Sequence, residues 1–324
     1  MKRSRILIVD GLNAYYRSYI VDPSLSTNGV PIGGVKGFLK ILQKLVRETT
    51  PDRVAIVWDG PGGSMRRRQV NQGYKEGRKP IRLNRDVRNL TEDQELENKV
   101  WQQMRLVEYL NEMPISQIMI PAIEADDVIS LITQLPTLKG WQKVIVSSDK
   151  DFFQLCDDET VLLRPIQKEV LNKNMILEKH GIHPTNFALA RAIAGDKSDN
   201  LPGVPGAGLK TVAKRLPFLS EEKSYTIDEV VDFCKNTESK LKAFKSIVEH
   251  ADVVRENYQI MQLYSPSMSP QAKRQVKVAI NDLDPEFNKT GIVKMMHEDG
   301  FGVYDWSDLF VAMKRIVSFP IDKE

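Results

Sequence analysis

The stretch Ile6-Leu7-Ile8-Val9-Asp10-Gly11 decides the fold of this chain. Its first four residues are apolar and mostly β-branched, which is typical of a strand buried in a parallel sheet. Two further runs share this pattern, at Val54 to Trp58 and at Val144 to Val146. We therefore predict three parallel strands, and an acidic residue follows each of them: Asp10, Asp59 and Asp149.

Helical patterns lie between these strands. Val35 to Val46 repeats apolar residues at helical spacing, and Val128 to Leu135 does so after a cluster of acids. Ile118 to Ile120 and Val161 to Leu163 are candidates for a fourth and a fifth strand. Strands that alternate with helices predict an α/β fold with a mostly parallel central sheet flanked by helices.

A basic region from residue 61 to about 98 interrupts this alternation. It has no apolar run, and its glycines and Pro80 break any long helix. A solvated surface insertion is the plain alternative, but so long a loop inside a compact domain is uncommon and tends to be functional. Residues 66–88 carry a local charge of +7, from Arg66, Arg67, Arg68, Lys75, Arg78, Lys79, Arg82, Arg85 and Arg88 against Glu76 and Asp86.

The remaining pattern predicts three parts. Residues 1–200 form a core that includes the insertion at 61–98. Residues 200–265, where glycine and proline separate helical patterns, form a helical subdomain, and residues 266–324 form an extension that packs on the core. A chain of 324 residues with 41% hydrophobic content can bury a core and still carry a second substructure.

The bulk composition limits the class of function. The formal charge is only +3, so any nucleic-acid surface must come from local segregation of charge. Cys156 and Cys234 are too few for a disulfide framework and fit a reducing compartment. No apolar run approaches the roughly 20 residues that a membrane span needs. We expect a soluble protein of the cytoplasm.

Nine carboxylates occupy positions that a parallel sheet would bring together. Ligand sites in open α/β sheets form at the carboxyl ends of strands, where Asp10, Asp59 and Asp149 are expected. Each acid taken alone could be a helix cap or a solvated turn residue, but these three together argue against that alternative. The full set is Asp10, Asp59, Glu124, Asp126, Asp127, Asp149, Asp151, Asp196 and Asp199.

So many carboxylates at close quarters require compensating cations, because like charges raise one another's pKa. All-oxygen ligands favour Mg²⁺ or Mn²⁺ over zinc, and the four histidines have no ligand spacing with the cysteines. Two such ions about 4 Å apart would activate a water and stabilise the leaving oxygen of a phosphodiester. The acids therefore predict a two-metal site.

A glycine-rich stretch runs from Gly203 to Thr211, Gly-Val-Pro-Gly-Ala-Gly-Leu-Lys-Thr. It is not a Walker A loop, because Leu209 separates Gly208 from Lys210. We interpret it as a tight turn between two helices, whose glycines let backbone N–H groups approach a DNA phosphate. A turn of purely structural purpose is the alternative. Lys210, Lys214 and Arg215 would add charge to the same contact.

Together these motifs resemble the 5′-nuclease superfamily. The likeness is greatest to bacteriophage flap endonucleases and 5′-to-3′ exonucleases of the phage RNase H type, and to the related domain of bacterial DNA polymerase I. It covers residues 6 to about 215. The motifs follow the family's order: Leu7-Ile8-Val9-Asp10-Gly11, Val57-Trp58-Asp59-Gly60, Glu124-Ala125-Asp126-Asp127, Ser147-Ser148-Asp149-Lys150-Asp151, Gly195-Asp196-Lys197-Ser198-Asp199-Asn200 and Gly203 to Lys210.

The resemblance implies a PIN-like nuclease core, a helical arch at the insertion and a helix-hairpin-helix subdomain after residue 200. It assigns the carboxylates to two metal sites, with Asp127 the least certain member. The first site comprises Asp10, Asp59, Glu124 and Asp126, and the second comprises Asp149, Asp151, Asp196 and Asp199, with Asp126 near both.

The resemblance also implies roles for the basic residues. In the arch, Lys75 and Arg78 contact the scissile phosphate, with Arg82 as the alternative arginine, and Tyr74 stacks on a terminal base. Because glycines and Pro80 disfavour a continuous helix, we expect the arch to order on substrate. The implied DNA contacts are Gly203, Gly206, Gly208, Lys210, Thr211, Lys214, Arg66, Arg67, Arg68 and Arg82.

The implied function is a structure-specific 5′-nuclease, acting as a flap endonuclease, a 5′-to-3′ exonuclease and a remover of RNA primers in replication. We expect two or more Mg²⁺ ions, replaceable by Mn²⁺, and K⁺ at the hairpin is a further candidate. The expected partners are DNA with 5′ flaps, nicks or branches and RNA–DNA hybrids, with a single-strand binding protein or sliding clamp as a candidate. A monomer in the cytoplasm, of the host if the chain is viral, is expected.

Two rival functions stay open. The first is a PIN-like ribonuclease with a related acidic sheet, against which the hairpin and the basic arch argue. The second is a non-catalytic binder of branched DNA, which would gain nothing from nine clustered negative charges facing phosphate.

Overall fold

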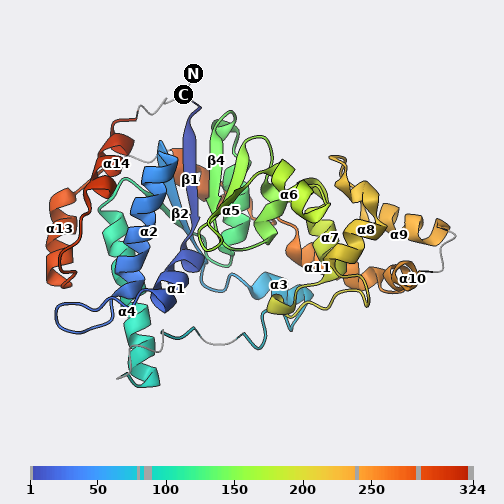
Figure 1. The fold of residues 1–324 in the computed structure, drawn as a ribbon, viewed down its shortest axis with the longest axis horizontal. Helices are drawn as coiled ribbons and strands as arrows, with labels where there is room; N and C mark the ends of the chain where they lie inside the picture. The colour runs from blue at the N-terminus through green and yellow to red at the C-terminus, as the bar shows by residue number, and fades with distance from the viewer. Residues whose placement is uncertain (1–2, 79–80, 84–89, 238–240, 282–285, 320–324) are drawn as a thin grey trace.

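A six-stranded sheet forms the centre of the computed structural model, which describes residues 3–78, 81–83, 90–237, 241–281 and 286–319 (Figure 1). The strand order is β3-β2-β1-β4-β5-β6. The first five strands pair in parallel, and β6 pairs antiparallel with β5. The predicted α/β fold is thus confirmed. The strands are β1 (Arg5–Asp10), β2 (Arg53–Trp58), β3 (Ser116–Met119), β4 (Gln142–Val146), β5 (Thr160–Arg164) and β6 (Glu169–Leu171).

Helices cover both faces of the sheet. Ile6 and Ile8 of β1 belong to one buried cluster, with residues of α5, whereas Leu7 and Val9 belong to a second cluster, with residues of α2. Because both faces are buried, the central strands need apolar residues on both sides, which explains their continuous apolar runs. In Figure 1, α2, α4, α13 and α14 lie on one side of the strands and α6 to α11 gather on the other.

The α-helices make up about half of the described chain. None of them in the described ranges combines the length and the apolar character that a membrane crossing requires. Their bounds are α1 (Gly11–Val21), α2 (Gly33–Thr49), α3 (Met65–Val70), α4 (Glu92–Asn111), α5 (Ala125–Thr133), α6 (Lys173–His180), α7 (Phe187–Ala194), α8 (Leu209–Arg215), α9 (Ile227–Asn236), α10 (Lys242–Glu249), α11 (Ala251–Met261), α12 (Pro270–Asn281), α13 (Lys289–Glu298) and α14 (Ser307–Val317), with short 3₁₀ turns that include η2 (Asp151–Leu155) and η4 (Lys197–Asp199).

The basic insertion is shorter than predicted at its far end. Thr91 and Gln94 form a capping box, so α4 begins at Glu92 rather than after residue 98. In the sequence, the acidic residues of the first turn of α4 resemble a polar loop, although acidic residues at this position stabilise the start of a helix. Within the insertion, the only described α-helix is the short α3. Lys79, Pro80, Arg85, Asp86 and Arg88 lie outside the described residues.

The three-residue strand β6 was also missed, because it is too short to show a pattern.

The C-terminal helices lie against the core. α12 contacts α5 and β3, and α14 contacts α2.

We expect Leu309→Ala to destabilise the protein by about 2–5 kcal/mol, the range for a leucine deleted from a packed core. Leu309 of α14 is fully buried in the cluster that α2 shares. Urea unfolding measures the change in free energy. Val311→Ala on the same helix is the control, since Val311 is 68% exposed, and an equal loss in both variants would show that α14 does not contribute to the core.

Candidate metal centre and nucleic-acid interface

Asp10 stands at the carboxyl end of the central strand β1. One carboxylate oxygen accepts the backbone N–H of Asn13 at 3.1 Å, and the other accepts the hydroxyl of Ser147 at 3.0 Å. Burial raises the pKa of Asp10 to about 7, against the two hydrogen bonds, and the charges of Asp59 and Asp149 raise it too. The strand ends therefore bring these aspartates into mutual electrostatic range, as expected for parallel neighbours.

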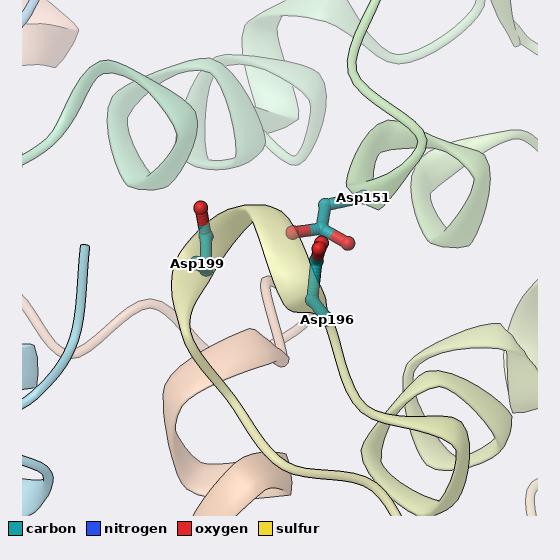
Figure 2. A group of neighbouring side chains, drawn as sticks. All are labelled: Asp151, Asp196 and Asp199. Atoms are coloured by element: carbon teal, nitrogen blue, oxygen red, sulfur yellow. The ribbon is translucent and has the colours of Figure 1, made fainter. Parts of the chain in front are cut away.

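A second group of carboxylates lies beside the loop after α7. Asp151, Asp196 and Asp199 each offer an oxygen atom, and the three oxygens lie within 4.8 Å of one another. Figure 2 shows Asp151, from η2, close to Asp196; Asp196 directly precedes the turn η4 and Asp199 ends it. Burial raises the pKa of Asp151 to about 7, and the charge of Asp149 adds to this, whereas Arg191 opposes it.

Arg191 of α7 serves this second group as a cation. Its guanidinium lies 2.9 Å from Asp151 and also pairs with Asp196. Burial alone would raise the pKa of Asp196, but hydrogen bonds from Ser198 and the charge of Arg191 lower it. The carboxylates of this second group therefore have the positive charge of Arg191 beside them.

The first group centres on the start of α5. Glu124 is its N-cap residue and is only 4% exposed, and Ala125 donates its N–H to Asp59 at 2.6 Å. Arg67 pairs with Glu124, with Asp126 at 2.9 Å and with Asp127 at 3.3 Å.

Burial tends to raise the pKa of both aspartates in this group. The charge of Arg67 and its hydrogen bond lower the pKa of Asp126 below its usual range. The pKa of Asp127 is raised to about 6 by burial and by the charge of Asp126. The two neighbours therefore titrate very differently, because Arg67 contacts Asp126 more closely.

Residues of the predicted arch lie against both groups. Lys75 pairs with Glu124, and Arg78 pairs with Asp199. Tyr74 donates its hydroxyl to Glu124 at 3.2 Å, and the residue is 3% exposed. Burial lowers the pKa of Lys75, although nearby carboxylates oppose that shift.

The donor set fits hard divalent cations. Every predicted ligand is a carboxylate, and described histidines and cysteines do not join the cluster. Basic side chains contact both groups, which shows how strongly these acids require positive charge. Such a site can bind two ions and polarise a phosphodiester.

The glycine-rich stretch occupies the second half of a longer connection than predicted. α7 ends at Ala194 and α8 begins at Leu209, so η4 and the acids beside it lie within the same connection. A Cβ at Gly203 would lie 2.0 Å from the carbonyl oxygen of Ala194, so only glycine permits this approach. Gly206 has a φ of 77°. Lys210 and Lys214 are exposed and form no ion pair within the described ranges.

Residues 5–181 match the model of the family described as "5'-3' exonuclease, N-terminal resolvase-like domain". The chain is a member of this 5′-3′ exonuclease family. The resemblance inferred from the motifs is thereby confirmed, and the chain is a nuclease by family.

Two relatives define the likeness in sequence. A 5′-3′ exonuclease of Aquifex aeolicus is 28% identical over 284 residues, which cover 86% of this chain and 88% of that protein. The thermostable DNA polymerase I of Thermus aquaticus is 34% identical over 216 residues, which cover 66% of this chain and 24% of the polymerase. The chain therefore spans most of the first relative and about a quarter of the second.

A solved structure shows the same fold. The bacteriophage T5 5′-exonuclease with divalent zinc ions has a TM-score of 0.64 and 18% identity, with 91% of this chain and 98% of that chain covered.

Three residues with predicted nucleic-acid contacts make contacts within the protein in this structure. Arg67, a predicted DNA contact, is 8% exposed and its guanidinium pairs with carboxylates, whereas its neighbours Arg66 and Arg68 are exposed. Tyr74, predicted to stack on a base, is packed against apolar side chains in this state. Arg82 pairs with Glu92 of α4 at 2.9 Å and with none of the predicted metal ligands, whereas Arg78 pairs with Asp199. Arg78 is therefore the arch arginine next to the predicted metal centre.

Two residues of the site were missed. Arg191 interrupts the apolar run of α7, Phe-Ala-Leu-Ala-Arg-Ala-Ile-Ala, and a lone charge in such a helix was the available signal. Ser147, which donates to Asp10, directly follows β4 and opens the motif Ser147 to Asp151, but the sequence carried no signal for its contact with Asp10.

Proposed function

We propose that this protein is a divalent-ion-dependent, structure-specific 5′-nuclease that cuts 5′ flaps and degrades strands from their 5′ ends. The observation that carries the proposal is the meeting of the Asp151, Asp196 and Asp199 oxygens within 4.8 Å, next to the strand-end aspartates. Family membership supports the 5′-to-3′ direction. A fold shared with a T5 flap endonuclease solved with DNA and metal ions supports the flap activity.

Mg²⁺ is the proposed resident ion, with Mn²⁺ able to replace it, because the donors are all oxygen. When bound, the ions would activate a water and stabilise the leaving oxygen. The proposed ligands are Asp10, Asp59, Glu124, Asp126, Asp127, Asp149, Asp151, Asp196 and Asp199.

The chain's own cations supply the remaining charge stabilisation. Lys75 and Arg78 lie at the two carboxylate groups. Each can exchange its carboxylate for a scissile phosphate once divalent ions neutralise the acids, and a fixed cation there stabilises charge that develops in the reaction. Tyr74 would have to leave its apolar packing to meet a base, which supports our proposal that the arch rearranges on substrate.

The hairpin is the proposed grip on duplex backbone, with Lys210, Lys214 and Thr211 beside Gly203, Gly206 and Gly208. We expect Lys210→Gln/Lys214→Gln to weaken duplex binding and to reduce the slope of log K against log salt by up to about 2, since each lost phosphate contact removes about 0.9. Fluorescence anisotropy at several salt concentrations measures this slope.

The matched control for the hairpin is Lys223→Gln/Lys235→Gln in the same subdomain, because those lysines are paired with acids. An unchanged slope in the hairpin variant would assign the backbone contact elsewhere. A K⁺ ion at the hairpin, RNA–DNA hybrids as substrates, a monomeric state and a single-strand binding protein or clamp as partner remain part of the proposal.

Cleavage of end-labelled substrates tests the proposed function directly. The set contains a 5′ flap, a nicked duplex, an RNA-primed duplex and a 3′ flap, each with Mg²⁺ and with EDTA. We expect metal-dependent cutting confined to the substrates with 5′ ends. Binding without cutting in Mg²⁺ or Mn²⁺ would instead favour a non-catalytic binder of branched DNA.

A further inference from the structure

Arg67 differs from every other basic residue of the insertion that the structure describes. It is the middle member of three consecutive arginines on the short helix α3, and only its side chain is buried. The guanidinium contacts Glu124 and Asp126, which belong to the first predicted metal site, and Asp127, the least certain of the predicted ligands. Arg67 therefore occupies a position where positive charge is otherwise expected from a divalent ion.

A second contact holds this arrangement in place. The Nε–H of Arg67 donates to the carbonyl oxygen of Ile260 at 3.0 Å, in the last turn of α11. The side chain is thus tied to the helical subdomain on one side and to the start of α5 on the other. The planar guanidinium of Arg67 is buried with its forked N–H donors held by these partners, so it is not free to reach a DNA phosphate.

The charge of Arg67 offsets repulsion among the three acids that it contacts. Three acids close together, two of them on adjacent residues, repel one another in a partly desolvated site. Lys75 pairs only with Glu124 among these acids, so Arg67 is the one described side chain that bridges all three. Without it, the acids would depend on a bound divalent ion for their neutralisation.

We propose that Arg67 is a built-in counter-cation, which holds Glu124, Asp126 and Asp127 together in the ion-free protein and competes with divalent ions for them. The inference rests on the proposed function, because it assumes that these acids bind divalent ions. It makes Arg67 a positioning residue that sets the ion concentration at which the site fills.

The test compares Arg67→Gln with Arg68→Gln, its exposed neighbour on the same helix, and with Arg67→Lys, which keeps the charge but lacks the fork. Thermal unfolding is measured in EDTA and in saturating Mn²⁺, and Mn²⁺ affinity is measured by electron paramagnetic resonance of the free ion. Neither readout requires catalysis.

In EDTA we expect Arg67→Gln to lower Tm by about 5–10 °C, with little change for Arg68→Gln and an intermediate value for Arg67→Lys. Saturating Mn²⁺ should remove most of that deficit, because the ion replaces the lost charge. The Kd for Mn²⁺ should fall about tenfold in Arg67→Gln, since a nearby positive charge has gone. If Arg67→Gln does not fold in EDTA, refolding on addition of Mn²⁺ supports the same coupling.

A Tm deficit that is equal in EDTA and in Mn²⁺ would overturn the proposal, because it would show that Arg67 only fills space. An unchanged or higher Kd would overturn it as well. If the unaltered protein binds no Mn²⁺ at all, the proposed function fails first, and the two failures are therefore distinguishable.

Discussion

Replacement of Asp149 or Asp151 by Asn is expected to lower the single-turnover cleavage rate of a 5′ flap by about 10²–10³-fold or more, the scale for removing one stabilising group from a preorganised site. Asp151→Asn removes a negative charge from the group that includes Asp196 and Asp199, and Asp149→Asn removes one that acts on Asp151, while both keep the side chain's size. Binding of the same flap in Ca²⁺ should stay largely intact, because the proposed DNA contacts lie elsewhere.

Asp158→Asn is the matched control. Asp158 lies a short distance after Asp151 in the chain, is 80% exposed and pairs with Lys173 at 2.8 Å. Cleavage at the unaltered rate in Asp151→Asn would remove that residue from the proposed metal site. Loss of both cleavage and binding would indicate misfolding, which thermal unfolding of the variants checks.

In EDTA, the free energy of unfolding is expected to fall as the pH rises from about 4 to about 7. The folded-state pKa of Asp10 and of Asp151 is raised to about 7, chiefly by burial, whereas an unfolded aspartate titrates near 3.9. The folded state therefore binds more protons across this interval, and stability declines as the pH rises through it.

Two neighbouring acids act in the opposite direction at lower pH. Against the effect of burial, Arg67 lowers the pKa of Asp126. Ser198 and Arg191 lower the pKa of Asp196 in the same way. They contribute stability that is lost as the pH falls below about 4. In EDTA, stability should therefore be greatest at mildly acidic pH.

Urea unfolding at several pH values, with and without Mg²⁺, measures this profile. Saturating Mg²⁺ should flatten the decline between pH 4 and pH 7, because the bound ion favours the charged carboxylates. A pH profile that is the same with Mg²⁺ and with EDTA would show that Asp10 and Asp151 do not bind the ion.

Much of the fold follows from local sequence pattern. The runs that became β1, β2 and β4 are continuous and apolar because both faces of a parallel sheet are buried, and that requirement is visible without any knowledge of neighbours. The short β6 and the acidic start of α4 escaped prediction. A three-residue strand is too short to show the alternation of apolar and polar residues, and acidic residues at the start of a helix resemble those of a polar loop.

The acidic half of the site was also predictable. Asp10, Asp59 and Asp149 follow strands, and the order of parallel strands brings such ends to one edge. The family assignment rests on the same motifs, and the match of residues 5–181 confirms it. The roles of individual ligands remain predictions.

The sequence by itself therefore determined the α/β fold, the family and which acids follow the strands, because buried strands and the residues after them are visible as local patterns along the chain. Only the tertiary structure decided which cations face those acids. Arg66, Arg67 and Arg68 are chemically identical neighbours on a helix too short for a pattern to orient, and the packing of α3 against α11 turns only Arg67 inward. The same holds for Arg191, whose partner Asp151 lies on another segment of the chain.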